Sequence, residues 1–136
     1  MLTKNPYKTP QTQQKGFNSY VGVQFTLLSD EKCVITLPMR EELCNAMGIA
    51  HGGVISTLTD VAAGTMALHA DRRQRGIVTQ SCTIHYLRPA MGSVLRAESR
   101  IVRKGHRICV TSVDVLSEDG SLAATAVYEV YYLDED

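Results

Sequence analysis

The residues from 45 to 60 combine three groups that can take part in catalysis. Asn45 contributes an amide side chain, His51-Gly52-Gly53 follows, and Asp60 is a single acid farther along. If a helix begins at the glycines, its first backbone N–H groups are unpaired, carry partial positive charge and can be approached closely by a ligand. An oxyanion hole is built from such donors, and one of them contributes about 2.7–4 kcal/mol to stabilising a tetrahedral intermediate. A glycine turn that leads into a helix and binds no ligand would have the same sequence.

Asp60 favours a catalytic interpretation, because an acid in the middle of a core helix is costly unless it is paired or used. One alternative is a structural acid that accepts hydrogen bonds from Ser or Thr hydroxyl groups. The other is a general base or a nucleophile in acyl transfer.

The spacing of Gly52 and Asp60 constrains how they could act together. Eight residues of one helix span about 12 Å along the axis, so one substrate carbonyl cannot lie within ~3 Å of both. Two helices that run antiparallel about a two-fold axis would remove this difficulty, and the small residues Ser56, Thr57 and Gly64 would permit their close approach. We therefore predict a homodimer with two composite sites, each using Gly52 of one chain and Asp60 of the other.

Hydrophobic periodicity places these groups on one long helix. Apolar residues recur at helical spacing from Val54 to Met66, and the opposite stripe is small and polar. The helix is expected over residues 53–70, with the arginines of 72–75 as its solvated end. Alternating or β-branched runs predict strands over 23–27, 33–37, 77–87, 94–102, 108–116 and 123–133, with a helical turn and a loop over 41–47. These elements predict an α+β domain of six mostly antiparallel strands with the helix as its core.

The composition indicates one domain, with residues 1–16 as a polar arm and residues 17–136 as the folded unit. The net charge of zero argues against a nucleic-acid or an anionic-membrane partner. The four cysteines include no Cys-x-x-Cys pair, so we interpret them as reduced core residues and expect no metal site. No stretch reaches the ~18 apolar residues of a membrane span, and the N-terminus lacks an apolar signal-peptide core, so the expected location is cytoplasmic.

The pattern of Asn45, His51-Gly52-Gly53 and Asp60 resembles the signature of hotdog-fold acyl-CoA thioesterases, specifically the phenylacetate-pathway (PaaI-like) and 4-hydroxybenzoyl-CoA type. The predicted order of a hairpin, one helix and four strands is also the hotdog order, and the resemblance covers residues 21–133. It implies a six-stranded antiparallel sheet wrapped around one long central helix. It also implies a homotetramer built from two dimers.

The resemblance implies a role for each residue that matches the pattern. Gly52 would donate its backbone N–H to the thioester oxygen, and Asp60 would activate water or attack directly. Asn45 would orient the water or the thioester, and His51 would support that end of the site. Thr79 lies where relatives often carry a hydroxyl group, frequently a serine, that holds the attacking water.

Coenzyme A would be part of the substrate, and no separate cofactor is expected. Its phosphates and pantetheine would need cations and exposed backbone near the site. The residues that resemble these contacts are Gly53, Arg88, Pro89, Arg103, Lys104, Gly105, His106 and Arg107. An ordinary charged hairpin is the alternative interpretation of residues 103–107.

Three functions remain open at the level of sequence. The first is hydrolysis of an acyl- or aryl-CoA to the free acid and CoA. The second is a hydratase or dehydratase of the same fold, although such relatives often carry a proline-rich approach to the helix that is absent here. The third is a non-catalytic acyl-CoA-binding protein. The sequence does not identify the acyl group.

Overall fold

The computed structural model describes residues 15–134, so the expected arm over residues 1–16 lies almost entirely outside the described residues. The two longer helices and the short 3-10 helix are α2 (Phe17–Val21), α3 (Gly52–Ala70) and η1 (Glu41–Leu43). The strands are β1 (Gln24–Leu28), β2 (Cys33–Pro38), β3 (Ile77–Tyr86), β4 (Val94–Lys104), β5 (Ile108–Leu116) and β6 (Leu122–Tyr132). All six predicted strands and the long helix are confirmed, whereas α2 was not predicted.

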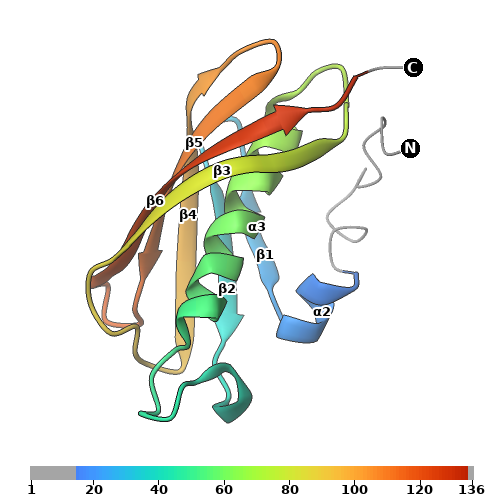
Figure 1. Ribbon diagram of the computed structural model, residues 1–136. Helices are drawn as coiled ribbons and strands as arrows, with labels where there is room; N and C mark the ends of the chain where they lie inside the picture. The colour runs from blue at the N-terminus through green and yellow to red at the C-terminus, as the bar shows by residue number, and fades with distance from the viewer. Residues whose placement is uncertain (1–14, 135–136) are drawn as a thin grey trace.

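The strands form one sheet in the order β1-β2-β4-β5-β6-β3, and every neighbouring pair is antiparallel. The sheet curves around α3, which contacts β2, β3, β4, β5 and β6 (Figure 1). The α+β hotdog architecture expected from the sequence is therefore confirmed. β3 is the last strand in this order and pairs only with β6 among the described strands, so it lies at the edge of the sheet.

The buried face of α3 is rotated from the predicted one. Val54 and Val61 are only half-buried, whereas Ile55 and Ala63 belong to the core. Gly64 was expected on the open stripe, but it is buried, and a Cβ added there would lie 3.1 Å from Ile77 Cδ1. The reason is that β3 passes beside this face and covers its C-terminal half.

Hydroxyl groups from the sheet also fix the helix. The bonds are Ser99 Oγ to Ala62 O, Tyr132 Oη to Ala67 O, and a pair between Thr59 Oγ1 and Tyr128 Oη, each 2.7 Å long. All three lie in the core, where a polar group must be hydrogen-bonded to avoid a desolvation cost. They therefore hold α3 in one rotational setting on the sheet.

At the C-terminal end of α3, Arg72 and Arg73 are exposed as expected, but Arg75 is buried in an ion pair with Asp71. Arg75 donates to both carboxylate oxygens of Asp71, and its Nη1 also donates to His106 O at 2.9 Å. Lys104 Nζ lies 3.5 Å from Asp71, and both cations lie over the ring of Tyr132. Burial alone would raise the pKa of Asp71, but hydrogen bonds from Arg75 and the two nearby positive charges lower it.

All four cysteines are free thiols, but only Cys33 and Cys109 are core residues. Burial raises the pKa of the Cys33 thiol to about 11. Cys82 is exposed because it lies on the edge strand β3, and Cys44 is half-buried in the segment before α3. The prediction that all four are core residues is therefore wrong for these two.

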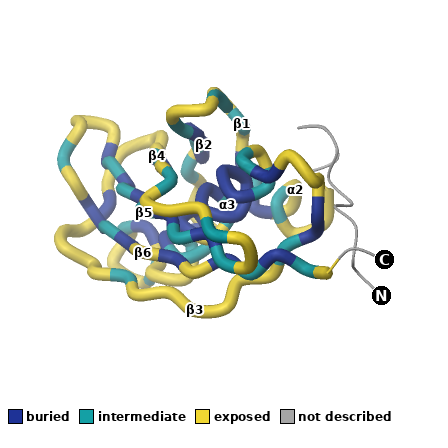
Figure 2. Tube along the Cα trace, turned by 90° about the horizontal axis from the view of Figure 1, so that it is seen from above, coloured by how far each residue is buried: buried dark blue, intermediate teal, exposed yellow. Residues whose placement is uncertain are grey.

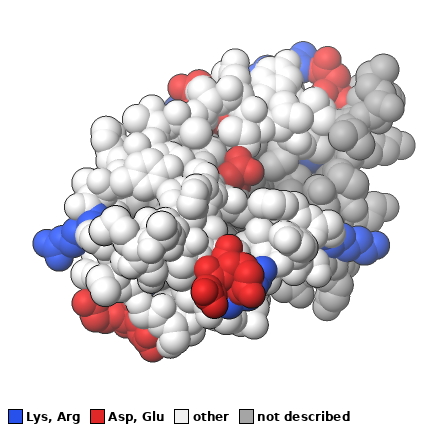
Figure 3. All heavy atoms as spheres, turned by 60° about the horizontal axis from the view of Figure 1, so that its bottom comes forward, with Lys and Arg blue, Asp and Glu red and all other residues white. Residues whose placement is uncertain are grey.

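Most of the face shown in Figure 3 is uncharged, and its Asp, Glu, Lys and Arg side chains form a few small, separate groups. Within residues 15–134, no helix is long and apolar enough to cross a membrane. The same residues contain no group of three side chains that could hold a metal ion.

Candidate active site

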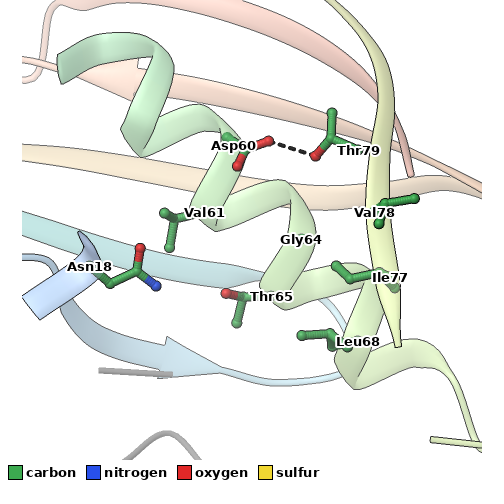
Figure 4. A pocket seen from close by; sticks show the side chains of 9 residues that line it. All are labelled: Asn18, Asp60, Val61, Gly64, Thr65, Leu68, Ile77, Val78 and Thr79. Atoms are coloured by element: carbon green, nitrogen blue, oxygen red, sulfur yellow. Dashed lines mark hydrogen bonds between the residues drawn. The ribbon is translucent and has the colours of Figure 1, made fainter. Parts of the chain in front are cut away.

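Asp60 and Thr79 meet across the gap between α3 and β3. Thr79 Oγ1 donates to Asp60 Oδ1 at 2.6 Å (Figure 4). A bulge between Thr79 and Ser81 shifts the register of β3 against β6 at this point. The carboxylate is exposed in the single chain, on the small and polar stripe of α3 where the sequence places it. The reason is that it projects from the side of α3 that the sheet leaves open.

A hollow of about 270 Å³ adjoins this pair, and we call it the Asp60 hollow. It is lined by Asn18, Asp60, Val61, Gly64, Thr65, Leu68, Ile77, Val78 and Thr79. Figure 4 shows the side chains of Leu68 and Ile77 beside α3, whereas that of Val78 points away. The contribution of Asn18 could not be predicted, because α2 is too short to show a periodic pattern.

His51 forms the N-cap of α3 and orders the glycines behind it. Its Nδ1 accepts a hydrogen bond from the Gly53 N–H at 2.8 Å. The Gly53 donor is thus already used. The Gly52 N–H has no hydrogen-bond partner within residues 15–134, and Gly52 is exposed. Of the two glycines, Gly52 is the one whose donor is available to a ligand.

Tyr86 supports Gly52 from the end of β3. Its hydroxyl group donates to Gly52 O at 3.4 Å, and a Cβ added to Gly52 would lie 3.7 Å from Cε1 of its ring. Sequence reasoning missed this residue, because the contact joins positions 34 residues apart. Tyr86 therefore defines how the start of α3 sits against the sheet.

Asn45 organises the turn that leads to His51. Its Oδ1 accepts hydrogen bonds from the N–H groups of Met47 at 2.9 Å and Ile49 at 3.3 Å. The backbone N–H of Asn45 also donates to Ile49 O. The oxygen of this amide is therefore occupied within its own turn, which leaves its NH₂ group for any contact with a substrate.

The predicted oxyanion donor and the predicted acid are not brought together within one chain. Both lie on the uninterrupted helix α3, where eight residues correspond to about 12 Å along the axis. Gly52 lies at the N-terminal end of α3, whereas Asp60 lies about two turns further along. A single chain therefore presents two half-sites.

The predicted coenzyme A contacts lie at opposite ends of the molecule. Arg88 and Pro89 follow β3 near the start of α3, where Ala50 N–H donates to Ala90 O. Residues 103–107 comprise the end of β4 and the turn that leads to β5, which Figure 1 shows in orange at the C-terminal end of α3. In this turn Lys104 interacts with Asp71, and Arg107 forms an ion pair with Asp134.

A family model described as "Thioesterase superfamily" matches residues 47–124, which contain α3, β3 and the Asp60–Thr79 pair. The chain belongs to the thioesterase superfamily. Medium/long-chain acyl-CoA thioesterase YigI of Escherichia coli K12 is 35% identical to it over 131 residues, covering 84% of both chains. Acyl-coenzyme A thioesterase 13 of Homo sapiens is 31% identical over 110 residues, covering 79% of this chain and 77% of the human protein.

Solved structures of other proteins share the fold. Thioesterase HI1161 of Haemophilus influenzae superposes on the present protein with a TM-score of 0.87 at 18% identity. The match covers 98% of the present protein and 96% of HI1161. The BH2602 protein of Bacillus halodurans, whose crystal structure contains CoA, gives a TM-score of 0.71 at 31% identity. That match covers 74% of this chain and 66% of BH2602.

The arrangement gives this thioesterase the groups that thioester hydrolysis requires. Asp60 offers a carboxylate at the edge of a hollow, and Thr79 holds one of its oxygens in place. Gly52 offers an N–H that no other described residue uses, at a helix N-terminus where partial positive charge favours a developing oxyanion. A carboxylate and an oxyanion donor together can add water to a carbonyl and release a thiol.

Proposed function

We propose that the protein hydrolyses acyl-CoA thioesters as a homodimer, with Asp60 of one chain acting beside the Gly52 N–H of the other. The hydrogen bond of 2.6 Å between Thr79 and Asp60 beside an open hollow carries this proposal. Hydrolysis of acyl-CoA is also what the names of the human and the E. coli relatives state of those proteins.

The exposed edge of the sheet supports a dimer. β3 is ten residues long, pairs with β6 on one side only, and is exposed along most of its length (Figure 2). A long edge strand presents unpaired N–H and C=O groups that favour pairing with a second chain. Antiparallel pairing of two β3 strands about a two-fold axis would extend the sheet and bring two α3 helices side by side.

The open face of α3 is suited to such an approach. Ser56 Oγ and Thr57 Oγ1 both donate to Gly53 O, at 2.9 and 2.8 Å. Their hydroxyl groups are thus satisfied within the helix and need no water at an interface. A partner helix packed here would enclose Asp60 and place the partner's helix start within reach of it.

In the proposed reaction, Asp60 takes a proton from a water molecule that Thr79 helps to position, and the water oxygen attacks the thioester carbonyl. The Gly52 N–H of the partner subunit stabilises the oxyanion, which collapses with loss of the CoA thiolate. Alternatively, Asp60 attacks the thioester carbonyl itself and expels the CoA thiolate to form an anhydride, which water then hydrolyses. A single turnover in H₂¹⁸O that labels the Asp60 carboxylate identifies the second route, because water can place ¹⁸O there only by attacking the aspartyl carbonyl of the anhydride.

The basic residues at opposite ends of the molecule fit the same arrangement. In an antiparallel dimer, the β4–β5 turn of one chain approaches the start of the partner's α3. Residues 103–107 and Arg88 would then lie on one side of a composite site and bind the CoA phosphates. Association of two dimers into a homotetramer and a cytoplasmic location are further parts of the proposal.

A thiol-release assay over a panel of acyl-CoAs, with Asp60→Asn as the control, tests the function. The wild type is expected to release thiol, and Asp60→Asn is expected to lose activity by orders of magnitude while still binding ligand. Substrate consumption without thiol release would favour a hydratase. Ligand binding without turnover would favour a non-catalytic acyl-CoA-binding protein.

A further inference from the structure

Glu118, in the turn between β5 and β6, holds consecutive residues of the loop between β3 and β4. Its carboxylate accepts hydrogen bonds from Ser93 N–H at 2.6 Å and from Ser93 Oγ at 3.0 Å. Its backbone N–H donates to Met91 O at 3.3 Å. Gly92 lies between these two residues with φ 107°, and a Cβ added there would be 2.5 Å from Glu118 Cβ. The side chain of Glu118 therefore packs directly on the backbone of this loop.

The β3–β4 loop is held less firmly immediately after Arg88. Pro89 has no N–H to donate. Ala90 O accepts a hydrogen bond from Ala50 N–H at 3.2 Å, at the long end of the ordinary range. The position of Arg88 relative to the start of α3 therefore depends on how firmly residues 91–93 are held.

The side chain of Arg88 is available to a ligand. Arg88 is exposed, and its guanidinium forms no hydrogen bond or ion pair with another of residues 15–134. Hydrogen bonds from Ser121 lower the pKa of Asp119 in the β5–β6 turn, and the nearby charge of Arg88 lowers it further. Figure 1 shows this turn and the β3–β4 loop at the end of the molecule where α3 begins. The guanidinium is thus near the half-site that Gly52 provides, with donors suited to a phosphate.

We propose that Glu118 is a positioning residue for coenzyme A: by holding residues 91–93, it keeps the Arg88 guanidinium where it can bind a phosphate of CoA. The proposal rests on the proposed function, in which Arg88 contacts CoA. Glu118 itself touches neither the substrate nor the reacting atoms. Its charge alone would have the opposite effect, because a carboxylate near the site repels phosphate. Removal of Glu118 should therefore weaken binding only if its contacts with the loop matter.

The test compares two substrates that differ only in the phosphate-bearing part. They are the acyl-CoA that releases thiol fastest in the panel and the pantetheine thioester of the same acyl group. Arg88→Ala is expected to raise KM for the CoA thioester by about tenfold, which corresponds to loss of one hydrogen bond between charged groups. Glu118→Ala should raise it by about three- to tenfold, because Arg88 is displaced and not removed. In both variants kcat, and KM for the pantetheine thioester, should stay unchanged.

Two control variants separate the contacts of Glu118 from its charge. Glu118→Gln keeps an oxygen that can accept from Ser93 N–H, so its KM should return close to the wild-type value. Asp119→Ala removes the neighbouring carboxylate, whose oxygen accepts from Ser121 N–H and not from the β3–β4 loop. It should not raise KM for the CoA thioester.

The β3–β4 loop should stay folded in Glu118→Ala, because two of its hydrogen bonds do not use that side chain. Met91 N–H donates to Ser117 Oγ at 3.1 Å, and Met39 N–H donates to Ser93 O at 2.8 Å. If Glu118→Ala nevertheless does not fold, Ser93→Ala removes only the hydroxyl bonds to Glu118 and should raise the same KM by a smaller factor.

A double-mutant cycle shows whether Glu118 acts through Arg88. In the Arg88→Ala background, Glu118→Ala should cause no further rise in KM, since both changes remove one contact. A rise in KM with both substrates, or a lower kcat with unchanged KM, would give Glu118 a general structural role and overturn the inference. So would an unchanged KM for the CoA thioester in Glu118→Ala or in Arg88→Ala. Absence of thiol release with every acyl-CoA would instead overturn the proposed function itself.

Discussion

Replacement of Gly52 by proline would remove the proposed oxyanion donor and leave the helix in place. Gly52 is the first residue of α3 after the N-cap His51, the helical position at which proline is accepted without loss of a hydrogen bond. His51 has φ −63° and ψ 141°, the extended conformation that a residue before proline adopts. A Cβ at position 52 would meet only the ring of Tyr86, at 3.7 Å.

The expected effect of Gly52→Pro separates catalysis from folding. Loss of one oxyanion donor lowers kcat by about 10²–10³-fold. The free energy of unfolding should stay the same or rise by about 0.4–1 kcal/mol, because proline restricts the unfolded chain. The matched control is Gly52→Ala, which makes the same Cβ contact but keeps the N–H and should therefore retain most of the activity.

The measurements are kcat from a thiol-release assay and the free energy of unfolding from urea titration, for all three proteins. A low kcat with intact stability in Gly52→Pro alone supports the backbone donor. Near wild-type kcat in Gly52→Pro would refute the reasoning, because that protein has no N–H at this position.

Three further predictions follow from the contacts of named residues. Thr79→Val should lower kcat/KM by about 10- to 100-fold, since a hydrogen bond to a charged group contributes about 1.5–3 kcal/mol, whereas Thr79→Ser should stay close to wild type. Thr57→Arg places a charge on the open face of α3 and should give a folded monomer without activity, as measured by sedimentation and thiol release; an active monomer would contradict the composite site. Asp71 has a pKa held below its unfolded value of 3.8, so its stabilisation is present above that pH and is lost as the pH falls through the folded pKa. Asp71→Asn should be about 3–5 kcal/mol less stable at pH 7 and should lack this acid-dependent loss in urea titrations at pH 7 and pH 3; an unchanged pH profile would contradict the assignment.

The elements of this fold were predictable because periodicity is a local property of sequence. Alternation in β4, the β-branched residues of β5 and the long apolar pattern of α3 identify strands and helix without reference to any neighbour. The rotation of α3 about its own axis, which decides the residues that face the core, could not be predicted to within one residue. It depends on how far β3 extends around the helix. Gly64 illustrates this, since Ile77 of β3 lies so near it that an added Cβ would be 3.1 Å from Ile77 Cδ1.

The residues of the candidate site that could be named in advance are those whose proposed roles follow from residue type and spacing. Gly52, Asp60 and Thr79 could be named from the sequence and a resemblance, and Thr79 indeed bonds to Asp60. Tyr86 and Asn18 could not be named, because they reach the site through tertiary contacts.

The buried pair of Asp71 and Arg75 was missed for a related reason. The arginines of residues 72–75 directly follow a helix, and this pattern predicts a solvated helix end. The chain instead turns back at Gln74, which has φ 55°, and this turn brings Arg75 onto Asp71.

Mixing two inactive variants tests the composite site most directly. Asp60→Asn keeps Gly52, and Gly52→Pro keeps Asp60, so each mixed dimer contains one intact site and one site that lacks both groups. Equal amounts of the two chains, unfolded and refolded together, should recover about a quarter of wild-type activity, because half of the dimers are mixed and each of these has one working site of two. If the mixture is no more active than the separate variants, the two groups act within one chain or not at all, and the shared site is wrong.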